Sequence, residues 1–98
     1  MSGRYTLTPR ARRDLDEIWI SSVRTGGPTQ AETSVRRLDG AFRDLAGGFK
    51  VGRNADDLRQ GYLLHSVGSH IVYYRRPDDL HIEIVRVLHG RMDPGRPL

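Results

Sequence analysis

A short break, Thr25-Gly26-Gly27-Pro28-Thr29, separates two stretches of helical periodicity in the first half of the chain. Glycine favours a helix C-terminus and proline is accepted in the first turn of a helix, so the break ends one helix and begins another. Apolar side chains recur at helical spacing over residues 11–23 before the break and over residues 31–45 after it. Because the connection is so short, we expect an antiparallel helical hairpin.

The residues before the first helix predict how it begins. Tyr5 and Leu7 alternate with polar neighbours, which indicates a short strand that stops at Thr8. The Thr8 hydroxyl can cap free helix amides, and Pro9 fits the first helical position, where no N–H is needed. We expect about four helical turns with one apolar and one charged face. The apolar face is expected to hold Ala11, Leu15, Ile18, Trp19, Ser22 and Val23, and the outer face Arg10, Arg13, Asp14, Glu17 and Arg24.

Beyond Gly47-Gly48, where the second helix is expected to end, the pattern changes from helical to strand-like. Residues 49–60 are polar and predict an irregular connection with one helical turn near residues 55–59. Three segments rich in Val, Ile, Leu and Tyr follow, separated by tight-turn residues. We expect them to form an antiparallel meander of three strands. The segments are residues 62–67, 69–75 and 80–88.

The last of these segments has apolar side chains on both faces. In a regular strand Ile82 and Ile84 point one way, whereas Val85 and Val87 point the other. Either a central strand covered on both sides or a bulge near Ile84-Val85 explains this pattern. Together the elements predict one α+β domain over residues 1–98: an N-terminal strand, an antiparallel helical hairpin and a three-stranded antiparallel meander, with the hairpin on one face of the sheet.

The composition excludes several classes of chemistry. The chain has no cysteine, which removes disulfides, thiolate catalysis and cysteine-containing metal sites. No stretch approaches the roughly 20 apolar residues of a membrane span, and the amino terminus has no apolar signal region, so we expect a cytoplasmic protein. The four histidines have no metal-ligand spacing, which favours ordinary polar roles over a metal site. Nothing in the sequence indicates a cofactor.

Basic residues outnumber acidic ones, sixteen to twelve, and Lys50 is the only lysine among them. Planar guanidinium groups suit carboxylate and phosphate partners, so an acidic protein or a nucleic acid is a candidate partner. A GC-rich coding sequence produces the same arginine bias, and both explanations stay open. Tyr73 and Tyr74 lie among basic residues, and neighbouring strand residues face opposite ways. A nucleic-acid-binding module that stacks bases on one tyrosine, with the other in the core, is therefore a further hypothesis.

Several segments of the chain, taken in order, follow the pattern of a known family. They are residues 5–11, Asp14-Leu15 and Ile18-Trp19, then Gly61-Tyr62 and residues 68–75, then residues 82–93. These segments resemble the first strand and helix, the hairpin, and the last strand and tail of ParE toxins in the RelE/ParE superfamily. The resemblance extends over nearly the whole chain.

The resemblance implies the toxin of a type II toxin–antitoxin pair that inhibits DNA gyrase by binding it, without catalysis. Its implied partner is an acidic, DNA-binding antitoxin of the ParD type, and neither a membrane nor direct nucleic-acid contact is expected. On this interpretation the helical hairpin and a sheet edge bind the antitoxin, and the tail binds the target. The expected antitoxin-binding residues are Arg12, Arg13, Trp19, Arg36 and Arg37, and the expected target-binding residues are His89, Arg91, Met92 and Arg96.

The alternative function is that of the RelE branch of the superfamily, which cleaves ribosome-bound mRNA. Attack by a ribose 2′-OH needs a base, a cation that holds the phosphate and an acid for the leaving oxygen. If the chain is a nuclease, Glu83, Arg86 and His89 are the expected base, cation and acid. Further candidates are Arg59, Arg75 and Arg91 as cations and His65 and His81 as acids.

Ordinary structural roles compete with each nuclease assignment. Glu83 and His81 share one face of the last strand and fit a solvated pair on a sheet edge. Arg86 fits an aliphatic stem against the core with its charged end paired. RelE-like nucleases commonly gather lysines and arginines around the sheet and place an aromatic or histidine acid near the carboxyl end. Here the single lysine lies in a loop and the last ten residues contain no tyrosine. These departures favour binding over catalysis.

Overall fold

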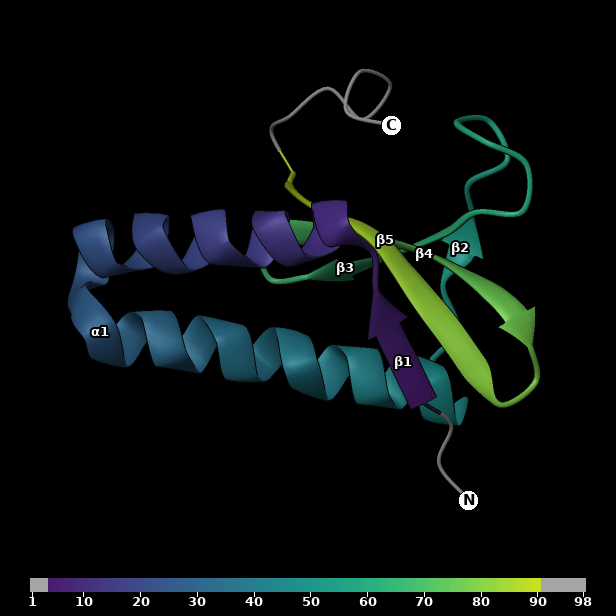
Figure 1. Ribbon diagram of the computed structural model, residues 1–98, viewed down its shortest axis with the longest axis horizontal. Coiled ribbons are helices and arrows are strands. Elements are labelled where there is room, and N and C mark those ends of the chain that lie inside the picture. Colours follow the sequence, from purple (N-terminus) through teal and green to yellow (C-terminus); the bar gives the residue numbers. More distant parts are fainter. Residues whose placement is uncertain (1–3, 91–98) are drawn as a thin grey trace.

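A helical hairpin packs against a five-stranded sheet in the computed structural model, which describes residues 4–90. The helical segment α1 spans Pro9–Gly47, and Figure 1 shows it doubling back so that its two halves run antiparallel. The predicted α+β fold with a helical hairpin is therefore confirmed. The strands are β1 (Arg4–Leu7), β2 (Arg53–Asn54), β3 (Leu63–Val67), β4 (His70–Asp78) and β5 (His81–His89).

Gly27 makes the turn between the two halves of α1. Its φ of 84° and ψ of 175° are not helical, and a positive φ is favourable mainly for glycine. Pro28 follows in the first turn of the next helical half, where its missing N–H costs nothing. We call residues 9–26 the first arm and residues 28–47 the second arm. The break predicted over residues 25–29 is confirmed in place but is shorter than expected.

Both ends of α1 are capped as the sequence predicts. Thr8 Oγ1 accepts a hydrogen bond from the Ala11 N–H at 3.0 Å, and the same hydroxyl donates to the Val85 carbonyl at 2.8 Å. Gly48 adopts a φ of 80° after the last turn, and its N–H donates to the Leu45 carbonyl. The Thr8 hydroxyl therefore both begins the helix and ties it to β5.

The sheet has the strand order β1-β5-β4-β3-β2. β3, β4 and β5 are antiparallel neighbours, which confirms the predicted meander. β1 lies parallel to β5, and the two-residue β2 lies antiparallel to β3; neither pairing was predicted. Between β2 and β3, the Ala55 carbonyl accepts hydrogen bonds from the Leu58 and Arg59 N–H groups, where one helical turn was expected. Because β1 covers its second edge, β5 is a central strand, as expected.

Val85 is an extra residue in β5. Tyr73 pairs with Arg86 and Tyr74 pairs with Ile84, so Val85 has no opposite residue in β4. Because of this bulge, Ile84 and Val87 both contribute to the same core although they are three positions apart. The bulge predicted near Ile84-Val85 is therefore confirmed.

The core lies between α1 and one face of the sheet, and the second arm supplies most of its helical part. The first arm contributes Ala11, with Leu15 and Ile18 partly buried. The other buried side chains of this core are Leu38, Ala41, Phe42, Leu45, Ala46, Val67, Val72, Tyr74, Ile82, Ile84 and Val87.

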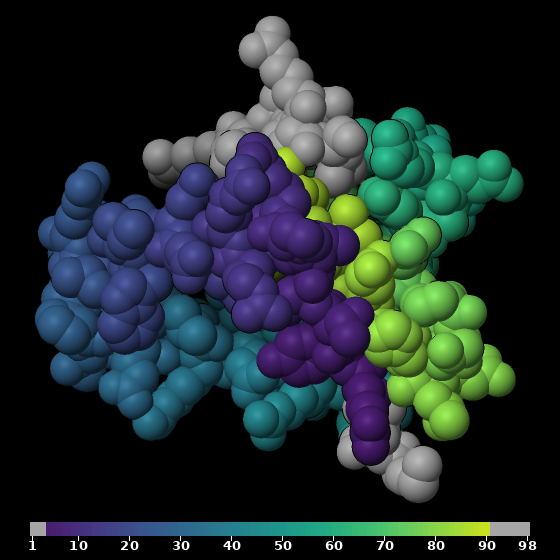
Figure 2. Space-filling model, viewed as in Figure 1, coloured from purple at the N-terminus to yellow at the C-terminus, as the bar shows by residue number. Residues whose placement is uncertain are grey.

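The first arm is rotated relative to the prediction. Trp19, expected on the apolar face, is 41% exposed, whereas Asp14, expected on the outer face, is 5% exposed. Asp14 is buried because it has an ionic partner inside the protein, Arg86. Trp19 is exposed because the hairpin is longer than the sheet that it covers. Figures 1 and 2 show the turn of the hairpin projecting beyond the strands, where an apolar side chain finds no sheet to cover it.

Candidate functional site

Asp14 and Arg86 form a buried ion pair between the first arm and β5. Arg86 Nε donates to Asp14 Oδ2 at 2.8 Å and a second guanidinium nitrogen donates to Oδ1 at 3.0 Å. The Val87 N–H also donates to Asp14 Oδ2, at 2.9 Å. The charged end of Arg86 is thus paired, as its structural interpretation predicts. Because this carboxylate is its bidentate partner and both side chains are buried, the guanidinium is not presented to a phosphate.

Glu83 and His81 also have partners within the sheet. Glu83 Oε1 accepts a hydrogen bond from Arg75 Nε at 2.6 Å, and Thr6 Oγ1 lies 3.0 Å from His81 Nε2. The two residues were expected on a sheet edge, and this expectation is wrong. β1 pairs with β5 at His81 and Glu83, so this part of β5 lies inside the sheet.

The three proposed nuclease residues do not converge. Glu83, Arg86 and His89 are spaced along β5 opposite Arg75, Tyr73 and His70 of β4. At the rise of a strand, six residues from Glu83 to His89 span about 20 Å, far more than one phosphate can bridge. Within residues 4–90, the groove that Arg86 and His89 both line does not include Glu83.

His89 stacks edge-on against His70 at the end of the sheet. The ring centroids are 5.7 Å apart with an interplanar angle of 81°. Burial lowers the pKa of His70, and the nearby His89 lowers it further. Both rings line a groove of about 480 Å³ bounded by the two arms, the β3–β4 turn and the end of β5. Most other side chains in this groove are polar, and Arg86 is among them whereas Glu83 is not.

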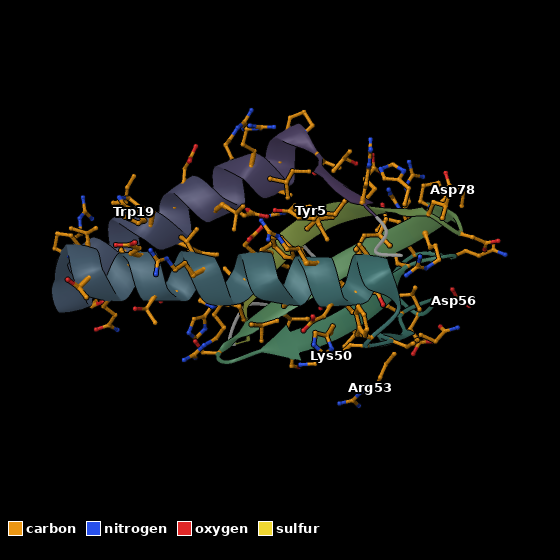
Figure 3. All side chains as sticks on the ribbon, turned by 90° about the horizontal axis from the view of Figure 1, so that it is seen from below. Tyr5, Trp19, Lys50, Arg53, Asp56 and Asp78 are labelled. Carbon is orange, nitrogen blue, oxygen red and sulfur yellow. The ribbon has the colours of Figure 1, made fainter. Side chains whose placement is uncertain are left out.

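The residues expected to bind the antitoxin are all on exposed positions of α1. Arg12, Arg13 and Trp19 come from the first arm, whereas Arg36 and Arg37 come from the second. Figure 3 shows Trp19 on the projecting part of the hairpin. Their role in antitoxin binding stays a prediction.

The exposed apolar side chains on α1 beside Trp19 and in the loop after α1 were not predicted. Ile20 is 50% exposed beside Trp19, and Phe49 and Val51 are 79% and 80% exposed in the loop after α1. The sequence held a signal for the loop pair, because large apolar residues in an otherwise polar connection have no core to enter.

The structure describes only part of the expected target-binding surface. His89 is exposed at the end of β5, whereas Arg91, Met92 and Arg96 lie outside the described residues. The assignment of this tail to the target therefore stays a prediction.

Neither tyrosine of β4 is available for stacking on bases. Tyr73 and Tyr74 are each 1% exposed, so the alternative hypothesis that one of them stacks on bases is wrong. Tyr74 lies in the core beneath α1, and its hydroxyl accepts a hydrogen bond from the Gly52 N–H at 2.7 Å. Tyr73 points to the opposite face of the sheet, where burial raises its pKa. Both faces of β4 are therefore covered at this point.

Residues 4–90 contain no group of three or more His, Cys, Asp or Glu side chains placed to hold a metal ion. In the same part of the chain, no helix combines the length and the apolar character needed to cross a membrane.

Comparison with known proteins identifies the family. A family model described as the ParE toxin of the type II toxin–antitoxin system parDE matches residues 5–94. This chain belongs to the ParE toxin family. Toxin ParE1 of Mycobacterium tuberculosis is 43% identical over 98 residues, which cover the whole of both chains. Toxin ParE1 of Caulobacter vibrioides is 38% identical over 89 residues, which cover 91% of each chain. The resemblance to ParE toxins is therefore confirmed, and the chain is a toxin of a type II toxin–antitoxin system.

Solved structures with the same fold include toxin–antitoxin assemblies. The chromosomal ParDE system from P. aeruginosa matches with a TM-score of 0.74 and 22% identity, covering 91% of this chain and 96% of that chain. The RelBE2 complex from Mycobacterium tuberculosis matches with a TM-score of 0.60 and 22% identity, covering 91% and 99%. Each match shows that this chain shares its fold with a chain of that structure.

Proposed function

We propose that this toxin inhibits DNA gyrase by binding it, without catalysis of its own, in the cytoplasm. The main support is the separation of Glu83, Arg86 and His89 along β5, two of them held in ion pairs. RNA cleavage needs a base, a cation and an acid around one phosphate, and these residues do not meet that condition. A binding function instead needs accessible surface, and the toxin has exposed apolar side chains on α1 and on the following loop.

An acidic antitoxin of the ParD type completes the proposal. The toxin has a formal net charge of +4, with arginines distributed along both arms of α1. Such a surface attracts an acidic partner and excludes other cationic proteins. The related structure from P. aeruginosa is of a ParDE system, which supports an antitoxin of this class for the present toxin.

Two assays distinguish gyrase inhibition from RNA cleavage. Purified toxin is added to a gyrase supercoiling reaction and, separately, to translating ribosomes with mRNA. We expect supercoiling to stop and the message to remain intact. Cleaved message with unaffected gyrase would overturn the proposal.

A single substitution tests whether toxicity needs catalysis. Glu83→Gln removes the candidate base and loses only a partly exposed ion pair, which contributes about 0–1 kcal/mol. Without catalysis, growth inhibition by the variant should match that of the wild type. A nuclease that uses Glu83 as its base should lose about 100-fold or more in activity.

Antitoxin binding should also be visible as stabilisation. The product of a short acidic open reading frame beside the toxin gene is the first partner to test. At a free concentration 100 times the Kd, such a partner adds about 2.7 kcal/mol to the stability of the toxin, which raises its Tm. An unchanged Tm at saturating antitoxin would contradict the proposal.

A further inference from the structure

His70 and His89 face each other across β4 and β5 at one end of the sheet. His70 begins β4 and His89 ends β5, and the two residues are register partners. Beside them, the Gly90 N–H donates to the Ser69 carbonyl at 2.8 Å. Because hydrogen-bonded and non-hydrogen-bonded pairs alternate along an antiparallel ladder, His70 and His89 form a non-hydrogen-bonded pair, in which side chains lie closest. The backbone therefore holds two imidazole rings side by side.

The separation of these rings is close to that of two histidines bound to one metal ion. A zinc–nitrogen bond of about 2.0–2.1 Å places the centroid of an imidazole about 3.2 Å from the metal. Two rings on one tetrahedral ion then have centroids about 5.2 Å apart. The centroids of His70 and His89 are 5.7 Å apart, at an interplanar angle of 81°. Rotation about χ2, which has broad torsional preferences, with a small movement of the rings, directs one nitrogen of each to a shared ion.

The surroundings of His70 favour the neutral form of its ring, which is the form that binds metal ions. Burial lowers the pKa of His70, and the nearby His89 lowers it further. Near pH 7 the His70 ring therefore has no proton that a metal ion must displace. An ion takes only one nitrogen from each ring, and the other nitrogen stays available for a hydrogen bond, as in metal-bound histidines generally.

The groove that the two rings line can accept a hydrated cation. Its volume is about 480 Å³, so water molecules can complete the coordination shell of an ion. Within residues 4–90, its charged lining residues are Arg10, Asp14, Glu17 and Arg86, two of each sign. Asp14 and Arg86 neutralise each other in their ion pair. These residues therefore present no excess positive charge to an entering cation.

Imidazole nitrogen also selects the kind of ion. Nitrogen ligands suit Zn²⁺, Ni²⁺ and Cu²⁺, whereas Mg²⁺ and Ca²⁺ prefer oxygen ligands. A phosphate group would instead require protonated rings, and the proximity of His89 opposes protonation of His70. The pair therefore favours a divalent transition-metal ion over a hard cation or an anion.

We propose that His70 and His89 bind one divalent transition-metal ion, such as Zn²⁺, where β4 begins and β5 ends. One nitrogen of each ring coordinates the ion, and water occupies the remaining positions, because residues 4–90 contain no larger group of metal-binding side chains. The two residues are far apart in the sequence, where ordinary polar roles were expected, and the strand register brings them together. The site goes beyond the proposed function and does not depend on it.

Calorimetric titration of the untagged toxin with Zn²⁺ tests the two ligands. We expect one ion per chain and an affinity that falls more than about tenfold for His70→Gln and for His89→Gln, since even the loss of a ligand's hydrogen-bond partner costs about 10–100-fold in metal affinity. His81→Gln is the matched control, because His81 is also in β5 but does not line the groove. Unchanged affinity in either ligand variant, or an equal loss in His81→Gln, would overturn the proposal.

Nuclear magnetic resonance identifies the ligands without any substitution, so this test does not depend on the folding of a variant. Adding Zn²⁺ should shift the ring signals of His70 and His89 and leave those of His65 and His81 unchanged. Mg²⁺ should shift none of them, because it prefers oxygen ligands. Equal shifts at all four histidines would show adventitious binding only, and the proposal would be wrong.

A bound ion should also stabilise the folded toxin. Zn²⁺ well above its Kd should raise the Tm of the wild type and of His81→Gln, and a chelator should reverse the rise. His89 is exposed, so His89→Gln should fold normally but show no comparable rise. A rise of the same size in His89→Gln would place the ion elsewhere and contradict the proposal.

Sedimentation distinguishes a site within one chain from a site between two copies. The sedimentation coefficient of the toxin should not change when Zn²⁺ is added. One ion per two chains, together with faster sedimentation, would assign the histidines to a contact between copies and overturn the proposal.

Discussion

The two arms of α1 are similar in length but are held to the sheet by different interactions. The second arm buries a row of apolar side chains that includes Leu38, Phe42 and Leu45. The first arm fully buries only Ala11 and Asp14, and Asp14 is bound to Arg86. The second arm is therefore stabilised by apolar area, and the first arm by a few directional bonds near its beginning.

This difference explains which arm can present apolar side chains to a partner. Apolar burial is non-directional, so the second arm needs a continuous buried stripe. A bidentate ion pair fixes position with one residue from each element, so the rest of the first arm need not be covered. Trp19 and Ile20 are left 41% and 50% exposed on this arm.

Asp14→Ala should have the largest effect on stability and would release the first arm. The free energy of unfolding should fall by about 3–5 kcal/mol, because the guanidinium of Arg86 stays buried without its bidentate partner. Urea denaturation followed by circular dichroism measures the loss.

The double variant Asp14→Leu with Arg86→Met is the control for Asp14→Ala. It removes both charges and leaves the Val87 N–H without its acceptor, which costs about 1–3 kcal/mol. A double variant as unstable as Asp14→Ala would show that packing, and not the unpaired charge, explains the loss.

The hairpin and the meander were predictable because their patterns are local. Helical spacing ends at Gly27, the strands alternate, and both signals lie within short windows of sequence. β1 was predicted as a strand, but its parallel partner was not, because the register between Leu7 and Ile84 depends on residues far apart in the chain. The two-residue β2 has no periodicity to detect.

The binding and catalytic candidates were harder to predict for a related reason. Asp14 was placed in solvent because aspartate is rarely buried without a partner, and its partner Arg86 lies 72 positions away. The paired end of Arg86 was expected, but which residue pairs with it was not. Glu83, Arg86 and His89 lie close together in the sequence and have the residue types of a base, a cation and an acid. Their spacing along one extended strand nevertheless keeps them apart in the structure.

Leu38→Ala tests the apolar attachment of the second arm. Leu38 is 2% exposed, and its truncation leaves a cavity that should cost about 2–5 kcal/mol. Val35→Ala on the same arm, at a partly exposed position, should cost less than about 1.5 kcal/mol. Denaturation midpoints give both values, and equal losses would contradict an attachment that depends on buried area.

Thr8→Ala tests the start of the first arm. The substitution removes the cap on the Ala11 N–H and the bond to the Val85 carbonyl, and should cost about 0.5–2 kcal/mol. Thr8→Ser retains a hydroxyl at the same position and should lose little. If the two variants have the same Tm, the cap does not contribute as proposed.

Acidification should weaken the toxin by a smaller amount, through His70 and His65. The folded-state pKa of each is below the usual 6.5, mainly because of burial, so the folded state resists protonation. Their contribution is complete above pH 6.5 and is lost as the pH falls through the lowered values. The Tm should therefore decline as the pH falls below 6.5. His70→Gln should make this decline shallower, and an unchanged slope would contradict the assignment.

The extra residue in β5 has a consequence for insertions and deletions. Side chains along β5 alternate between the two faces of the sheet, and Val85 interrupts this alternation. The Val85 carbonyl also accepts a hydrogen bond from the Thr8 hydroxyl at the start of α1. Deleting that one residue would restore a regular ladder, with Arg86 still opposite Tyr73, but would leave the helix start without the carbonyl that anchors it. Length variation among relatives should therefore be absent at this point and tolerated in the loop between β2 and β3.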